Sequence, residues 1–210
     1  MTDNRRPIKA RSAGWATGLT NALLKKHVSP NQISVASVLF ALIGAGVLIL
    51  NNGVFGSLLC ALCIQLRLLC NLLDGMVAIE GGKKSHLGIL YNEFPDRVAD
   101  SVLIVALGYA IGYSDLGWLG ALAAALTAYV RIFGGSIGLK QCFTGPMAKQ
   151  HRMALMTAAL LLNAVEASVY STHHVLLIAL AMITLGSLIT CGTRTLAITR
   201  QLKDTPHVDQ

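Results

Sequence analysis

Six apolar runs, separated by shorter polar segments, dominate the hydrophobic pattern of the chain. They cover roughly residues 33–50, 54–79, 87–112, 117–135, 153–170 and 175–193. A run of about 18 or more apolar residues is long enough to cross the hydrocarbon core of a bilayer as a helix. We therefore predict an all-α integral membrane protein, with six transmembrane helices in a domain of residues 32–200.

A different pattern precedes the first run. In residues 11–26, Trp15, Leu19, Ala22 and Leu23 follow one another at helical spacing, and basic residues stand at both ends of the segment. A helix with one apolar face and basic flanks is typical of a segment that lies on a membrane surface. The pattern predicts an amphipathic interfacial helix within the N-terminal segment 1–31, ended by the Ser-Pro-Asn sequence that opens the first span.

The composition agrees with a membrane protein, because 54% of the residues are hydrophobic and only 13% are charged. The formal net charge of +7 raises nucleic acid as a partner. However, fourteen of the seventeen Lys and Arg residues lie in the N-terminal segment, the connections after the second and fourth runs, and the segment that follows the sixth run. By the positive-inside rule, both termini, including the tail 201–210, are cytoplasmic. We expect a multi-pass protein of a bacterial inner membrane, in contact with anionic lipids and without a nucleic-acid partner.

Charged and amide side chains within the second and third runs are spaced so that they share helix faces. Arg67, Asn71 and Asp74 follow one another at steps of four and three residues, and Ala78 continues that face. In the third run, Gly88, Asn92, Asp96 and Asp100 follow at steps of four. Because a buried ionisable group in a bilayer is costly unless it is paired or faces water, such groups indicate a functional site.

Two antiparallel neighbouring helices would bring these faces together at matching depths. At about 1.5 Å of rise per residue, Asp74 pairs in depth with Asn92, Asn71 with Asp96, and Arg67 with Asp100. The first two pairs offer only carboxylate and amide groups, which suit a hard divalent cation. The third pair, Arg67 with Asp100, is expected to form a buried structural ion pair. The alternative is that the whole set is a structural polar network.

Three other features have ordinary explanations. Cys60 and Cys63 have the spacing of a zinc or redox pair, but no second Cys or His pair accompanies them, and small cysteines are common in membrane helices. Glu166 lies near the end of the fifth run without a partner that the sequence identifies, so we expect it to be exposed. Gly108 with Gly112 forms a small-residue pattern that could support a helix–helix dimer contact, as do Gly134 and Gly138.

The two polar faces carry a motif that resembles the signature of the CDP-alcohol phosphotransferases, D-x2-D-G-x2-A-R-x8-G-x3-D-x3-D. The matching positions, without a gap, are Asn71, Asp74, Gly75, Ala78, Ile79, Gly88, Asn92 and Asp96. Six spans, cytoplasmic termini and a surface helix before the first span also agree with this family of membrane enzymes. The resemblance extends over most of the chain.

The motif departs from the family pattern at three positions. Asn71 and Asn92 replace aspartates, which removes two negative charges and leaves open whether one metal ion binds or two. Ile79 replaces the arginine, for which Lys83 and Lys84 are possible substitutes. A second alignment, with one extra helical turn, would make Asp96 and Asp100 the last two acids of the motif. The ungapped alignment is preferred because it retains Gly88.

The resemblance implies transfer of a phosphatidyl-type group from a CDP-alcohol, such as CDP-diacylglycerol, to an acceptor hydroxyl, with release of CMP. It implies Mg²⁺ or Mn²⁺ as cofactor, bound by the matched motif positions Asn71, Asp74, Asn92 and Asp96. Asp96 would be the catalytic base, with Asp100 as the alternative. Nucleotide contacts are expected from Asp74, Gly75, Ala78 and Gly88, although Gly75 and Ala78 would also suit close helix packing.

The family's acceptor side carries basic residues, for which the sequence offers Arg131, Lys149 and Arg152. Taken alone, basic residues in the loop before the fifth span are also ordinary markers of topology. We further expect a homodimer, a small alcohol or alcohol phosphate as acceptor, and an active site on the cytoplasmic side. Two other hypotheses remain: an ion-coupled transporter, and a membrane scaffold that has lost its chemistry.

Overall fold

The computed structural model describes residues 13–82 and 88–204, apart from the side chains of Ile89 and Asn92. Lys83 and Lys84 therefore lie outside the described residues. The described helices are α1 (Gly14–Lys25), α2 (Pro30–Leu50), α3 (Val54–Glu80), α4 (Gly88–Ala110), α5 (Ser114–Ser136), α6 (Lys149–Val169) and α7 (His174–Asp204). The predicted all-α architecture is confirmed, and the six apolar runs correspond to α2 to α7 in chain order.

The composition of the helices is that of an integral membrane protein. Among the described helices, α2, α3, α5, α6 and α7 are long and apolar enough to cross a bilayer. The exception is α4, which has 23 residues but carries four charged side chains between positions 93 and 100. Large apolar side chains remain exposed on several helices, a surface suited to lipid: they include Leu42, Ile43, Leu122, Tyr129, Leu185 and Ile189.

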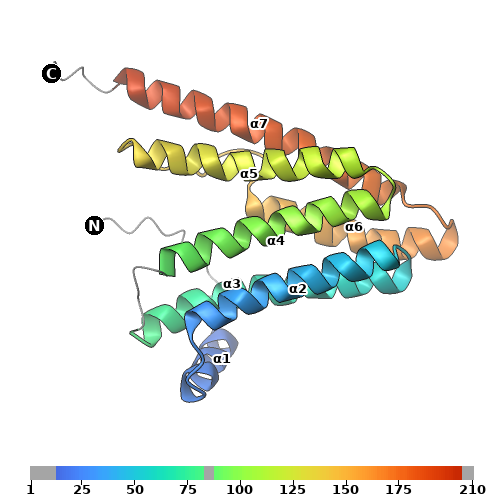
Figure 1. Cartoon of the computed structure of the whole chain (residues 1–210), viewed down its shortest axis with the longest axis horizontal. Coiled ribbons are helices and arrows are strands. Elements are labelled where there is room, and N and C mark those ends of the chain that lie inside the picture. Colours follow the sequence, from blue (N-terminus) through green and yellow to red (C-terminus); the bar gives the residue numbers. More distant parts are fainter. Residues whose placement is uncertain (1–12, 83–87, 205–210) are drawn as a thin grey trace.

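The six long helices pack as a closed ring. Following the contacts around it, α2 packs on α3, α3 on α6, α6 on α7, α7 on α5, α5 on α4, and α4 again on α2. The turns α2–α3, α4–α5 and α6–α7 lie at one end of the bundle, on the right in Figure 1. Residues 137–148, between α5 and α6, form a longer connection, and α6 begins well inside the bundle (Figure 1). This ring brings α3, α4, α5, α6 and α7 around one interior space.

The first helix lies across the other end of the bundle, beside the start of α2 and the end of α3 (Figure 1). Ser29 then caps α2: its hydroxyl accepts from the backbone N–H of Gln32, whose side chain accepts in turn from the backbone N–H of Ser29. The apolar face predicted for α1 is divided. Leu23 packs with the core of α2 and α3, whereas Trp15 and Leu19 remain 58% and 38% exposed.

Small residues allow the closest helix contacts. A Cβ atom on Gly108 of α4 would lie 2.7 Å from the Cα of Gly117 on α5, so these helices touch through their backbones. Gly134 similarly packs against Ile198 of α7. These contacts account for Gly108 and Gly134 within one chain, so the glycine patterns no longer support the predicted homodimer. Cys60 and Cys63 pack against α2 as buried free thiols, which agrees with a core role.

Candidate active site

A cavity of about 790 Å³ opens among α3, α4, α5, α6 and α7. This volume is within the ordinary range of small-molecule sites, about 300–1,000 Å³. Its polar lining combines three acids and three amides with five basic side chains and two threonines: Gln65, Asn71, Asp74, Glu93, Asp96, Arg97, Thr127, Arg131, Lys149, Gln150, Arg152, Thr157 and Arg194. A site with this lining suits an anionic ligand, provided that the acids have cations of their own.

The polar faces predicted for the second and third spans meet across α3 and α4. The side-chain amide of Asn71 donates to Asp96 Oδ1 at 2.7 Å, and Arg67 Nη2 donates to Asp100 Oδ1 at 2.6 Å. Two of the three predicted depth pairs are thus brought together by the structure. The third pair cannot be placed in the same way, because the side chain of Asn92 lies outside the described residues.

Asp74 is held on α3 by a contact with α2. The hydroxyl of Ser34 donates to Asp74 Oδ2 at 2.7 Å, while Asp74 Oδ1 is buried and has no hydrogen-bond partner. A buried carboxylate oxygen without a partner is costly, so it marks a place where a cation or a donor from a ligand would be stabilised. The oxygen and amide groups around it fit Mg²⁺ or Mn²⁺ better than a softer metal.

Within the described ranges 13–82 and 88–204, no group of three or more His, Cys, Asp or Glu side chains is arranged to hold a metal ion. The cavity lining also contains no Cys or His. An ion bound at Asp74 would therefore take its remaining ligands from amide oxygens, water or the phosphates of a substrate. This arrangement is usual for Mg²⁺ sites that bind phosphate compounds.

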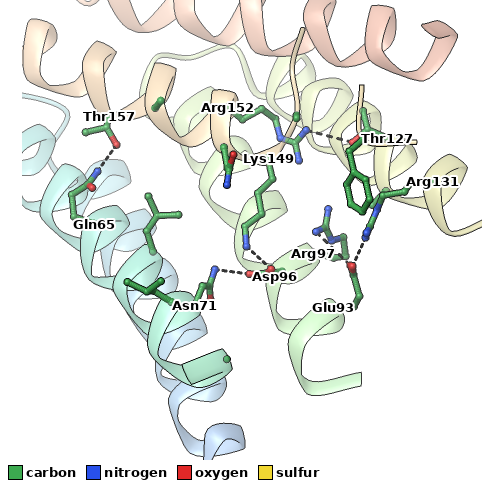
Figure 2. Close-up of a pocket in the computed structure, with 18 of the residues that line it drawn as sticks. Gln65, Asn71, Glu93, Asp96, Arg97, Thr127, Arg131, Lys149, Arg152 and Thr157 are labelled. Carbon is green, nitrogen blue, oxygen red and sulfur yellow. Dashed lines mark hydrogen bonds and ion pairs between the residues drawn. The ribbon is translucent and has the colours of Figure 1, made fainter. Parts of the chain in front are cut away.

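Asp96 projects from α4 into the same cavity and is surrounded by donors. Lys149, the first residue of α6, forms an ion pair with Asp96 Oδ2, and Asn71 approaches Oδ1 from α3 (Figure 2). Arg67 Nη2 lies 3.4 Å from Asp96 Oδ1. Lys149, predicted to contact the acceptor, thus contacts one of the predicted metal ligands in this structure.

Asp100 lies one helical turn further along α4 and forms a buried cluster with two arginines. Arg67 and Arg152 lie 2.6 Å and 2.9 Å from its two carboxylate oxygens, and all three residues are at most 2% exposed. Arg152 also donates to the carbonyl oxygen of Met147 at 2.7 Å. Because Asp100 is enclosed by arginines and does not line the cavity, its position is that of a structural group.

A second basic group occupies the α5 side of the cavity. Arg131 forms an ion pair with Glu93 of α4, and Arg97 lies 3.6 Å from the same carboxylate (Figure 2). The guanidinium of Arg131 also lies over the ring of Phe143, 5.2 Å from its centre. These contacts hold Arg131 at the cavity wall.

Arg194 follows the last predicted apolar run, 175–193, and was not among the predicted site residues, but it lines the cavity. It lies on α7, which continues as one helix to Asp204, well past the apolar run. Its Nε donates to the carbonyl oxygen of Thr144 at 3.0 Å, and the residue is 5% exposed. The unbroken helical pattern after the run was the signal that could have identified it.

The small residues of the motif are distributed differently from the expectation. Gly75 lines the cavity beside Asp74, whereas Ala78, one turn further along α3, does not. Gly88 is the first residue of α4 and is half-buried, but it is also absent from the lining. Of the predicted nucleotide contacts, the structure brings Asp74 and Gly75 to the cavity.

Comparison with known proteins identifies relatives of similar architecture, although no protein-family model matches the chain. The inner membrane protein YnbA of Escherichia coli K12 is 28% identical over 131 residues, which is 62% of this chain and 65% of YnbA, slightly under two thirds of that protein. The phosphatidylinositol phosphate synthase of Streptomyces avermitilis is 26% identical over 85% of this chain and 75% of its own. The archaetidylinositol phosphate synthase of Pyrococcus horikoshii is 26% identical over 68% of this chain and 74% of its own.

Solved structures share the fold. The phosphatidylinositol phosphate synthase PgsA1 of Mycobacterium tuberculosis, solved with CDP-DAG bound, has a TM-score of 0.77 and 17% identity and covers 94% of this chain and 98% of its own. The same enzyme solved with manganese and citrate has a TM-score of 0.77 and 16% identity, covering 93% and 92%. These relatives and this fold support the family resemblance identified from the motif.

Proposed function

We infer that the protein, a member of the CDP-alcohol phosphotransferase family, transfers a phosphatidyl group from a CDP-alcohol to an acceptor hydroxyl and releases CMP in phospholipid biosynthesis. The two relatives that are named synthases make phosphatidylinositol phosphate and archaetidylinositol phosphate, and the PgsA1 structure of the same fold holds CDP-DAG. The donor proposed for this chain is CDP-diacylglycerol.

The observation that carries this proposal is the division of the cavity into two chemical sides. Asp74 offers an unpartnered carboxylate oxygen on α3, while basic side chains on α5, α6 and α7 face the same space. A pyrophosphate needs a cation on one side and fixed positive charge around its remaining oxygens. One cavity of about 790 Å³ contains both the carboxylate oxygen that can bind a cation and the basic side chains that supply fixed positive charge.

A divalent cation, Mg²⁺ or Mn²⁺, fits the acidic side, and PgsA1 has been solved with manganese. Asp74 would hold the ion through its free oxygen, with the amide oxygen of Asn71 on the same wall; Asn92 stays a predicted ligand. When bound, such an ion neutralises the pyrophosphate and stabilises CMP as the leaving group. The fourth predicted ligand, Asp96, already accepts from Lys149 and Asn71.

We assign the role of catalytic base to Asp96 rather than to Asp100. Asp96 lines the cavity, whereas Asp100 does not, and both oxygens of Asp100 are engaged by Arg67 and Arg152. In the reaction, the acceptor oxygen forms a bond to the phosphorus next to the lipid, and the bond from that phosphorus to the CMP oxygen breaks. The hydroxyl proton passes to Asp96, whose charged form Lys149 stabilises until then.

Arg131, Arg152 and Arg194 would bind the acceptor on the opposite side. Three guanidinium groups around one cavity exceed what a neutral alcohol needs, and guanidinium binds phosphate in a bidentate way. We therefore propose an acceptor that carries a phosphate, such as inositol phosphate, in keeping with the products for which the two synthases are named.

We propose α4 as the sixth transmembrane span, because most of its charged side chains pair within the ring of helices. The exposed Trp15 and Leu19 support an interfacial position for α1, with both termini and the cavity on the cytoplasmic side, as the distribution of basic residues predicts. The predicted homodimer, and the division into residues 1–31, 32–200 and 201–210, stay predictions.

The experiment is an assay of CMP release by the purified protein in detergent, with CDP-diacylglycerol, Mg²⁺ or Mn²⁺, and a panel of acceptors that includes inositol phosphate, glycerol phosphate and serine. We expect metal-dependent release with a phosphate-bearing acceptor. Asp74→Asn and Asp96→Asn should each lower it by roughly 100-fold to 1,000-fold, the range for removal of one transition-state contact.

Asp115→Asn is the matched control, because Asp115 is an exposed acid on α5, near the α4–α5 turn, outside the cavity. It should leave CMP release unchanged. If no acceptor in the panel supports CMP release by the folded wild-type protein, the transferase assignment is wrong and the scaffold hypothesis is favoured.

A further inference from the structure

The three carboxylates that line the cavity and the buried Asp100 next to it differ in their partners. Glu93, Asp96 and Asp100 each form an ion pair with at least one Lys or Arg side chain: Arg97 and Arg131, Lys149 and Arg67, and Arg67 and Arg152, respectively. Among the described residues, Asp74 has no such partner. The hydroxyl of Ser34, a neutral group, donates to Asp74 Oδ2 at 2.7 Å. The cavity thus contains one carboxylate that forms no ion pair with a Lys or Arg side chain of the described residues.

Asp74 and Asp96 differ in whether a carboxylate oxygen is free to bind a metal ion. Both oxygens of Asp96 accept from side chains, Oδ2 from Lys149 and Oδ1 from Asn71 at 2.7 Å (Figure 2). One oxygen of Asp74 is buried and accepts from none. A metal ion can therefore coordinate Asp74 without displacing a protein group, whereas at Asp96 it would have to displace an ammonium group.

Charge repulsion also favours Asp74 over Asp96 as the ligand of a metal ion. A divalent ion bound at Asp96 would lie within a few ångströms of the Lys149 ammonium and of Arg67. Like charges this close repel more strongly in the protein interior than in water, and a divalent ion doubles the repulsion from each unit charge. The position of Lys149 is fixed by the fold, because it is the first residue of α6 and that helix begins inside the bundle.

We propose that the ammonium of Lys149 takes the place of a second metal ion at Asp96, so that the site binds a single divalent cation, at Asp74. The inference rests on the metal-dependent transfer proposed above and specifies its metal content. Lys149 supplies a positive charge beside the catalytic carboxylate, and the divalent ion supplies the other charge that the pyrophosphate requires.

The test is the stoichiometry of Mn²⁺ bound to the purified protein in detergent, measured by electron paramagnetic resonance with and without CMP. Wild type should bind one Mn²⁺ per chain. Lys149→Met removes the ammonium and frees Asp96, so it should bind a second Mn²⁺. Lys149→Arg keeps the positive charge and should still bind one.

Lys140→Met is the matched control, since it removes one positive charge from an exposed residue outside the cavity. It should leave the stoichiometry at one. Two Mn²⁺ ions in the wild type would overturn the inference even if Lys149→Met did not fold. A folded Lys149→Met protein that still binds one ion would also overturn it.

Because metal binding is measured without turnover, failure of the single-ion inference can be distinguished from failure of the proposed transferase function. Two bound Mn²⁺ ions together with CMP release would reject only the single-ion site. One bound ion without CMP release from any acceptor would reject the transferase and retain the single-ion site. A wild-type protein that binds no Mn²⁺ even with CMP would overturn the inference.

Discussion

Buried polar side chains at the two ends of the bundle are satisfied by different means. At the end formed by the α2–α3 and α6–α7 turns they are neutral. Asn163 donates to the carbonyl oxygen of Asn52 at 2.9 Å and to the hydroxyl of Ser57 at 2.8 Å, and its own oxygen lies 3.0 Å from Nδ1 of His173. Asn52 donates in turn to the carbonyl oxygen of Ala110 at 2.7 Å. This network joins three pairs of helices without an ion pair.

At the cavity end the buried groups are charged and incompletely satisfied. Among the described residues, buried side-chain atoms without a hydrogen bond include Asp74 Oδ1 and the Nε atoms of Arg67, Arg97 and Arg152, whereas no atom of the neutral network is among them. An unsatisfied buried group lowers stability unless a ligand completes it. The comparison indicates that the neutral network is structural and that the charged end is arranged for a ligand.

Glu166 lies at the same end of the bundle as the neutral network and differs from the expectation from the sequence. It was predicted to be exposed, and the sequence identified no partner for it. Its carboxylate instead accepts from the backbone N–H groups of His174 and Val175 at 2.8 Å and 2.9 Å, and from the hydroxyl of Thr172 at 2.7 Å. A carboxylate at the start of a helix satisfies free N–H groups and interacts favourably with the helix dipole.

The largest effect is expected from Asp100→Asn, which tests whether the charged end also contributes to stability. The variant leaves Arg67 and Arg152 buried without their shared carboxylate. Loss of one partner from a buried ion pair costs about 3–5 kcal/mol, which corresponds to a fall in Tm of roughly 6–20 °C for a protein of this size. Thermal unfolding in detergent measures it.

Asp115→Asn, the exposed acid on α5, is the control and should change Tm by no more than about 2 °C. A similarly small change for Asp100→Asn would contradict the structural role assigned to this cluster. The assignment of the catalytic base to Asp96 would then have to be reconsidered, since Asp100 would be free to act in catalysis.

A smaller effect is expected from Ser34→Ala, which concerns the carboxylate proposed to bind the metal ion. The Ser34 hydroxyl fixes the orientation of Asp74 through Oδ2. Loss of such a supporting contact typically lowers metal affinity by about 10-fold to 100-fold. Titration with Mn²⁺ should show this decrease, with one ion still bound at saturation.

Ser37→Ala is the matched control, because Ser37 is buried on the same helix and donates only to the backbone oxygen of Ser34. It should leave the Mn²⁺ affinity within about twofold of wild type. Equal affinities for Ser34→Ala and wild type would indicate that Asp74 is not a ligand of the ion.

The helices and the residues that share the polar face of α3 or of α4 could be predicted, because both depend on local periodicity. Long apolar runs specify spans, and steps of three and four residues place Asn71 and Asp74, or Asp96 and Asp100, on one face. Matching depths also predicted that the two faces meet, and their side chains do meet, but the expectation of neighbouring helices was wrong, because α2 packs between α3 and α4 in the ring. The part of the site formed by α3 and α4 could therefore be predicted from the sequence.

The partners supplied by other helices could not be predicted in this way. Lys149 meets Asp96 only because residues 137–148 return into the bundle before α6 begins, which no periodicity indicates. Ser34 contacts Asp74 across 40 residues of sequence, and a serine in an apolar span has no distinctive pattern. Such contacts depend on the order of helices around the ring.

The smallest effect is expected from Asn163→Leu, which breaks the neutral network without touching the cavity. Removing the amide leaves the carbonyl oxygen of Asn52 and the hydroxyl of Ser57 short of a partner, at a cost of about 1–3 kcal/mol. Tm should fall, while the KM for CDP-diacylglycerol and the rate of CMP release at a temperature where the variant is folded should equal those of wild type. Ser168→Ala is the control on the same helix, since its exposed hydroxyl bonds only to the backbone of its own helix. If folded Asn163→Leu lost CMP release as Asp74→Asn does, the two ends would be coupled and the division between a structural and a ligand-binding end would be wrong.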